Sequence, residues 1–97
     1  MNINTCVNDT IFTVSPEGRL DSASSGEFKT AVYQNLPASA RRLVFDFEKV
    51  DFISSMGIRI IVGLYKEFSG LKIVIVNANP SVREVFRLSG LNRFFED

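Results

Sequence analysis

The chain has 97 residues, 45% of them hydrophobic, which suits one domain that buries a core without disulfides or metal. Its 11 basic and 11 acidic residues give a net charge of zero, so no overall positive charge attracts nucleic acid or an anionic membrane. It contains no His, which removes the usual general base of serine and cysteine hydrolases and the commonest metal ligand.

These absences narrow the classes of function. We expect a protein that is not an enzyme, needs neither cofactor nor metal, and binds no nucleic acid. No run approaches the roughly 18 apolar residues of a membrane span and no signal peptide opens the chain, so we expect a cytoplasmic protein. The single Cys6 cannot form an internal disulfide, and we expect it at a buried position of a strand.

The chain begins with a predicted hairpin. Apolar residues alternate in residues 3–7 and 10–14, and Asn8 and Asp9 between them indicate a turn. Residues 16–18, Pro-Glu-Gly, should stop or bend the second strand, because Pro donates no hydrogen bond to a sheet and Gly tolerates positive φ.

A helix is predicted next. Apolar residues at a spacing of four indicate a helix from about Ser22 or Ala23 to Asn35. Asp21 or Ser22 would cap its start, and Pro37 would end it.

A strand and an amphipathic helix follow. Residues 43–47 form a nearly continuous apolar run that suits a central strand covered on both faces, and residues 48–51 have the polarity of a loop. The apolar spacing predicts a helix over residues 55–68, in which Gly63 indicates close packing against a neighbouring element.

The last strand and helix have clear boundaries. Residues 71–76 are apolar and β-branched, which predicts a strand. Asn79 as N-cap and Pro80 at the first position predict a helix that Gly90 ends. Residues 91–97 should form a last edge strand or pack as a tail.

This order predicts an α/β fold with a mixed, mainly parallel sheet of about four to five strands and packed helices. Such sheets bind ligands or partners at the carboxyl ends of their strands. Residues 51–57 and residues 77–79 should therefore emerge at the same edge of the sheet.

Two serines, Ser54 and Ser55, lie where the hydrophobic period changes from strand to helix. A helix start offers unpaired N–H groups and the positive end of a dipole, so a serine there is an N-cap or a seat for a phosphate. A phosphate would be held by the N–H groups of Met56 and Gly57, and Gly57 would let a partner approach closely. The spacing alone favours the cap.

Three segments together resemble a STAS domain of the anti-sigma factor antagonist family. They are residues 18–21 (GRLD), residues 52–58 (FISSMGI) and residues 79–91 (NPSVREVFRLSGL). The resemblance makes residues 1–97 a single STAS domain, in which a C-terminal helix common in the family is missing or truncated.

The resemblance implies a bacterial transcription regulator that binds a kinase-type anti-sigma factor and is switched off when that factor phosphorylates one serine. By position the phosphoacceptor is Ser55, and Ser54 replaces the Asp that is common before it. A phosphatase acting on the phosphoserine would then be a further partner. We expect the partner-binding residues at the corner and the sheet edge to be Asp21, Ser54, Ser55, Met56, Gly57, Arg59, Asn77 and Asn79.

A second interpretation belongs to another class of function. A STAS domain can be a scaffold that is never phosphorylated, within a stress-sensing complex or as a subunit of a lipid-transport complex. Ser55 would then only cap its helix.

Overall fold

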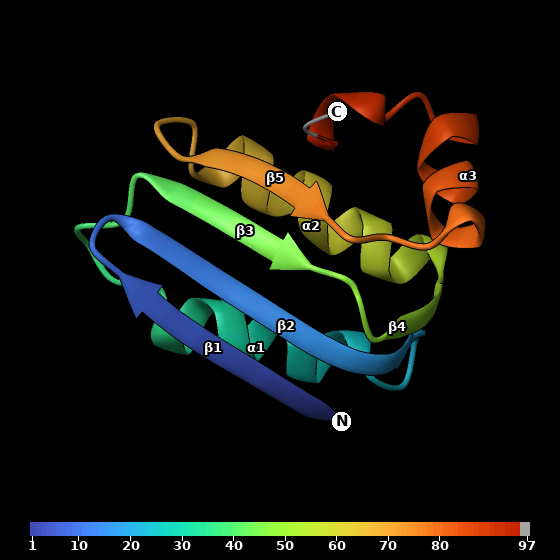
Figure 1. Cartoon of the computed structure of the whole chain (residues 1–97), viewed down its shortest axis with the longest axis horizontal. Coiled ribbons are helices and arrows are strands. Elements are labelled where there is room, and N and C mark those ends of the chain that lie inside the picture. Colours follow the sequence, from blue (N-terminus) through green and yellow to red (C-terminus); the bar gives the residue numbers. More distant parts are fainter. Residues whose placement is uncertain (96–97) are drawn as a thin grey trace.

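A mixed sheet backed by helices accounts for residues 1–95, the part of the chain that this computed structural model describes (Figure 1). The elements in chain order are β1 (Asn2–Asn8), β2 (Ile11–Leu20), α1 (Ser25–Asn35), β3 (Arg42–Asp46), β4 (Val50–Ile53), α2 (Ser55–Glu67), β5 (Lys72–Val76), α3 (Pro80–Leu88) and the 3-10 helix η1 (Asn92–Phe94).

The strand β2 organises the sheet. β1 pairs with it antiparallel, while β3 pairs with the first half of β2 in parallel, and β5 continues the parallel sheet beside β3. The second half of β2 pairs in parallel with β4 instead. Within the described residues the sheet therefore has five strands, and the predicted mixed, mainly parallel α/β fold is confirmed.

Residues 16–18 bend β2 without ending it. Gly18 takes a φ of 97°, and the register with β4 shifts between Gly18 and Arg19. Because Gly has no Cβ, it adopts this left-handed conformation without strain. β2 continues to Leu20 and so brings its last residues beside β4.

The prediction of a loop over residues 48–51 is confirmed for residues 48 and 49, which form a turn, and is wrong for Val50 and Asp51, which belong to β4. This strand has four residues, of which Val50 and Ile53 are buried while Asp51 and Phe52 are exposed. So short a segment shows no alternation that a sequence pattern could detect. Its pairing with the distant end of β2 makes it a strand.

Both long helices cover the same face of the sheet (Figure 1). In β3, Leu43 and Phe45 are buried, while Arg42, Val44 and Asp46 on the other face are half-buried. The prediction that this strand is covered on both faces is therefore wrong. The core between sheet and helices includes Phe12, Val14, Leu43, Phe45, Phe28, Val32, Ile61 and Leu64.

Cys6 is exposed, so its predicted burial is wrong. It lies in β1, at the edge of the sheet, opposite Thr13. Facing residues of paired strands point to the same side, and Thr13 alternates with the buried Phe12 and Val14, so Cys6 points away from the helices. An alternating pattern predicts a strand but does not tell which face will be covered.

The tail combines features of both predictions for its structure. Residues 92–94 form η1, and Phe95 then makes an isolated parallel bridge to Ile75 of β5. Phe94 and Phe95 are both buried, and each ring lies edge-on to Phe86 of α3. Residues 96 and 97 lie outside the described part of the chain.

Two glycines of α2 have opposite surroundings. A Cβ on Gly57 would lie 2.9 Å from Ile53 Cγ1 and 3.2 Å from the carbonyl oxygen of Leu20, so α2 begins tightly against β4 and the end of β2. A Cβ on Gly63 would meet nothing within 4 Å, so the predicted close packing at Gly63 is wrong.

Alanine substitutions at these two positions should therefore change stability in opposite directions. We expect Gly57→Ala to lower the free energy of unfolding by about 1–3 kcal/mol, since the carbonyl of Leu20 belongs to the backbone of β2. Gly63→Ala, the matched control, should raise it by up to about 1 kcal/mol. Urea unfolding followed by circular dichroism measures both, and equal effects would contradict this account of the corner.

Candidate functional site

The candidate site is the β4–α2 corner, which we define as residues 51–59. Ile53 is buried at the end of β4, and the next N–H, that of Ser54, donates to the carbonyl oxygen of Leu20 at 2.8 Å. Gly57 packs against the same two residues. These contacts connect the start of α2 to the ends of β2 and β4, so the sheet fixes where the helix begins.

The two serines of the corner have different roles. Ser54 is half-buried, has extended backbone angles and accepts a hydrogen bond from the Gly57 N–H on its side-chain oxygen at 3.4 Å, so it is the N-cap of α2. Ser55 is the first helical residue and is exposed, and its hydroxyl makes no hydrogen bond to any described residue.

Backbone N–H groups at this helix start remain available to an anion. The first N–H groups of a helix have no partner within it, and here the cap occupies that of Gly57. The groups of Ser55 and Met56 remain, at the positive end of a helix of 13 residues. Gly57 is buried, and its missing side chain makes room for Ile53 and Leu20 rather than for a partner.

Asp21 shapes the chain just after β2. Its Oδ1 accepts hydrogen bonds from the N–H groups of Ala23 and Ser24 at 3.0 and 3.1 Å, which holds residues 21–24 in a turn. This turn delays α1, which begins at Ser25, so the predicted start at Ser22 or Ala23 is wrong. The predicted cap is also wrong, because the N-cap is Ser24 and its side chain makes no capping bond.

The same turn lowers the pKa of Asp21. The largest cause is the hydrogen bond from the Ser24 N–H. Desolvation, the second largest, raises the pKa and opposes it, while the Ala23 N–H, the Ser24 hydroxyl and the Arg19 guanidinium lower the pKa further. The carboxylate therefore stays charged beside Leu20, whose carbonyl receives the Ser54 N–H.

Two residues that were not among the predicted partner-binding residues extend the site. The Arg19 guanidinium carbon lies 4.2 Å from the centre of the Phe52 ring, and the Arg19 Nε is 3.6 Å from Asp21 Oδ2. Arg19 and Phe52 are register partners on β2 and β4, so recognising β4 as a strand would have revealed this contact. The Phe52 side chain is 37% exposed.

Large exposed side chains follow Ser55 on α2. Met56 is 40% exposed, and Arg59, one helical turn after Ser55, is exposed and places its Nη1 4.0 Å from the Met56 sulfur. We call Arg19, Phe52, Ser55, Met56 and Arg59 the corner patch. Exposed Phe, Met and Arg side chains are typical of protein interfaces.

The asparagines predicted to join the site lie further from Ser55. Asn77 has a φ of 61° and donates to Asp46 Oδ1 at 3.0 Å, at the end of β3. Asn79 caps α3 as predicted, through Val82 N–H at 2.8 Å, and donates to the carbonyl of Val50 at 3.1 Å. Val50 opens β4 and Ser54 follows it, so the strand places about 13 Å between the two.

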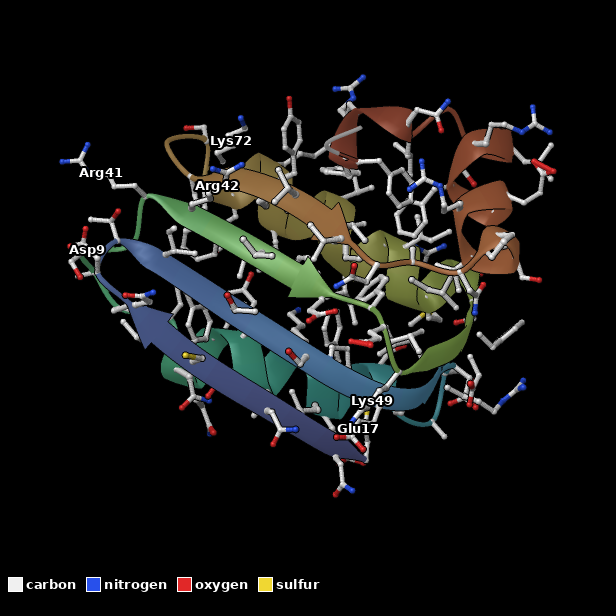
Figure 2. All side chains as sticks on the ribbon, in the orientation of Figure 1. Asp9, Glu17, Arg41, Arg42, Lys49 and Lys72 are labelled. Carbon is white, nitrogen blue, oxygen red and sulfur yellow. The ribbon has the colours of Figure 1, made fainter. Side chains whose placement is uncertain are left out.

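Several basic side chains lie away from the corner. Figure 2 shows Arg41, Arg42 and Lys72 at the opposite end of the sheet, while Lys49 pairs with Glu17 at 3.9 Å. No group of three His, Cys, Asp or Glu side chains that could hold a metal occurs in residues 1–95. None of the helices in that part is long and apolar enough to cross a membrane.

Two sequence comparisons identify the family of this chain. The family model of the STAS domain matches residues 2–96. A protein of Bordetella bronchiseptica named "Putative anti-sigma factor antagonist BtrV" is 30% identical over 81 residues, which cover 81% of this chain and 70% of that protein.

Solved structures share the fold. An anti-sigma factor antagonist from Mycobacterium paratuberculosis matches with a TM-score of 0.86 and 24% identity, over 98% of this chain and 82% of that one. The unphosphorylated anti-sigma factor antagonist SpoIIAA matches with a TM-score of 0.74 and 25% identity, over 99% and 87% of the two chains. The phosphorylated form of SpoIIAA, a cell fate determinant of Bacillus, matches with a TM-score of 0.71 and 22% identity, over 99% of this chain and 90% of that one.

The lowered pKa of Asp21 predicts a pH-dependent contribution to stability. Because the folded pKa is below the usual 3.8, Asp21 stabilises the fold above that pH and the contribution is lost as the pH falls through the folded pKa. Asp21→Asn should therefore be less stable than the wild type at pH 7, and the difference should vanish at low pH.

Urea unfolding across the pH range measures this difference. Asp51→Asn removes a carboxylate from the exposed part of β4 and controls for the change in net charge. An Asp21→Asn variant as stable as the wild type at pH 7 would contradict a stabilising contribution from the Asp21 charge.

Proposed function

The chain belongs to the STAS domain family and, within it, to the anti-sigma factor antagonists, and from this premise we propose that it binds a kinase-type anti-sigma factor through the corner patch and is released when Ser55 is phosphorylated. It acts in the cytoplasm as a binding regulator, and a phosphatase restores the active form.

The division of roles between Ser54 and Ser55 carries the proposal. A kinase needs a hydroxyl that is accessible and free to accept a phosphoryl group, and Ser55 is exposed while Ser54 is half-buried and caps α2. The helix start would also stabilise the product, because the N–H groups of Ser55 and Met56 and the helix dipole favour an anion there.

The corner patch supports a role in partner exchange. Phe52 and Met56 expose apolar surface that a partner can cover, and Arg19 and Arg59 can pair with acidic groups at its rim. A phosphate on Ser55 would add about −1.5 to −2 charge among these side chains. A partner that docks against Met56 would then have to desolvate that charge, so its affinity would fall.

The relatives are consistent with such a switch. SpoIIAA is an anti-sigma factor antagonist whose structure is known in an unphosphorylated and a phosphorylated form, and its fold matches this chain over nearly its whole length.

The phosphorylation site can be tested directly. Incubation of the protein with kinase-type anti-sigma factors and ATP should add one phosphate, which mass spectrometry should locate on Ser55. Ser55→Ala should abolish the modification. Ser54→Ala should still be modified, although loss of the cap should lower the free energy of unfolding by about 1 kcal/mol.

The two serine variants control for each other, because both remove one hydroxyl from the same corner. Modification of Ser55→Ala to the same extent as the wild type would contradict the assignment. Loss of modification in Ser54→Ala, with the variant still folded by circular dichroism, would move the acceptor to Ser54.

A charge at residue 55 should weaken partner binding. We expect Ser55→Asp to bind the anti-sigma factor at least about tenfold more weakly than Ser55→Asn, which has the same shape and no charge. Isothermal titration calorimetry without ATP measures both affinities. Equal binding by the two variants would instead support the interpretation as a scaffold that is never phosphorylated.

A further inference from the structure

The edges of the sheet differ in how they are covered. Beside β5, Phe95 bridges to Ile75 and η1 packs against the strand. Short β4 contacts α3 in addition to pairing with β2. By contrast, no described strand or helix pairs with the outer side of β1, which forms the opposite edge (Figure 1).

β1 lacks the features that usually protect an exposed edge. Its seven residues, Asn-Ile-Asn-Thr-Cys-Val-Asn, include no charged residue and no Pro. They pair with β2 in an unbroken register from Asn2 to Asn8, without a bulge. Proteins keep free edges from pairing with other strands by Lys, Pro or bulges, and this edge has none of them. A long, regular and neutral edge is suited to pairing with another strand.

The hairpin decides which backbone groups of β1 point outward. Its turn consists of Asp9 and Thr10, and a two-residue turn is closed by a hydrogen-bonded pair, here Asn8 and Ile11. Hydrogen-bonded and non-hydrogen-bonded pairs alternate along an antiparallel ladder. The even-numbered residues of β1 therefore bond to β2, and the N–H and C=O groups of Ile3, Thr5 and Val7 point away from the sheet.

These outward groups are self-complementary. Two copies of β1 laid antiparallel with Thr5 opposite Thr5 pair all seven residues, since Ile3 then faces Val7 and Asn2 faces Asn8 of the other copy. The outward groups of Thr5 meet as a hydrogen-bonded pair on the two-fold axis. Apolar side chains face each other, and no charges of β1 are brought together.

The surface beside β1 leaves room for the second copy. A hollow between β1 and the outer side of α1 is lined by Ile3, Gly26, Thr30 and Ala31. Its two charged groups, the N-terminal ammonium of Met1 and the Glu27 carboxylate, form an ion pair at 3.1 Å. α1 lies over β1 and β2, so pairing two β1 strands about 4.8 Å apart would place the two α1 helices about 10 Å apart. That is the spacing of packed helices, and small residues permit it.

We propose that this edge is a homodimer interface, in which β1 of two copies pair antiparallel about Thr5 and form one continuous sheet of ten strands, twice the five of one copy. The contact is isologous, so it closes at two copies and leaves no further β1 edge. It covers Val7, whose side chain is 54% exposed in one copy. The interface is separate from the corner patch and does not depend on phosphorylation.

A proline at the centre of the interface tests the proposal. Thr5→Pro removes an N–H that points outward, so the hairpin should remain folded while the two bonds on the two-fold axis are lost. We expect the dimer dissociation constant to rise about thirtyfold. Thr5→Val keeps the N–H and a similar side chain, and it should dimerise like the wild type. Sedimentation velocity over a concentration series measures all three proteins, and circular dichroism verifies their fold.

Cysteine crosslinking tests the register. Asn4 would face Cys6 of the second copy in a non-hydrogen-bonded pair with Cα atoms about 4.5 Å apart, within the span of a disulfide. Asn4→Cys should therefore crosslink into dimers under a mild oxidant. In the wild type the two Cys6 residues would lie about 8 Å apart and should not crosslink. Asn8→Cys, the matched control, would face Asn2 and should also remain uncrosslinked.

Three results would overturn the proposal. They are a wild type that stays monomeric at millimolar concentration, a folded Thr5→Pro variant that dimerises as strongly as the wild type, and a dimer in which Asn8→Cys crosslinks as well as Asn4→Cys. The last two would place any dimer contact elsewhere or in another register. None of the measurements uses a kinase, so their outcome is distinguishable from that of the Ser55 experiments.

Discussion

The shared pairing of β2 is the constraint on which the rest of the structure depends. Its first half pairs with β1 and β3, while its last residues, after the shift of register at Gly18, pair with β4. The carbonyl of Leu20, at the end of β2, then receives the Ser54 N–H and limits the space at Gly57. The start of α2 is thus positioned by a strand from the other end of the chain.

This arrangement separates structural from functional groups within a few residues. Ser54 and Gly57 point into the fold, where one caps α2 and the other permits close packing, whereas Ser55 and Met56 remain on the surface. A phosphate on Ser55 would therefore change the charge of the surface without removing a contact that holds α2 in place. The proposed switch acts by changing the surface charge that a partner contacts, and it requires no rearrangement of the fold.

The two proposed interfaces use different kinds of surface. The corner patch presents side chains, with exposed aromatic, thioether and guanidinium groups around one hydroxyl. The β1 edge presents backbone groups, whose pairing is indifferent to most side chains but sensitive to register. Since β1 lies at the edge of the sheet and the corner follows β4, a dimer would carry two corner patches, each open to its own partner (Figure 1).

The sequence by itself determined the order of most elements, the cap at Asn79, a capping serine at residue 54 or 55 and the family, because hydrophobic period, capping and the three motifs are local or nearly local patterns. Only the tertiary structure decided that residues 50–53 form a strand, that Cys6 is exposed and that Arg19 stacks on Phe52. Each of these depends on which distant segment lies alongside. A short strand forms because a distant strand supplies its hydrogen-bond partners, and an edge residue is exposed because no further strand lies beside it. Neither feature can be predicted from the residues next to it in the sequence.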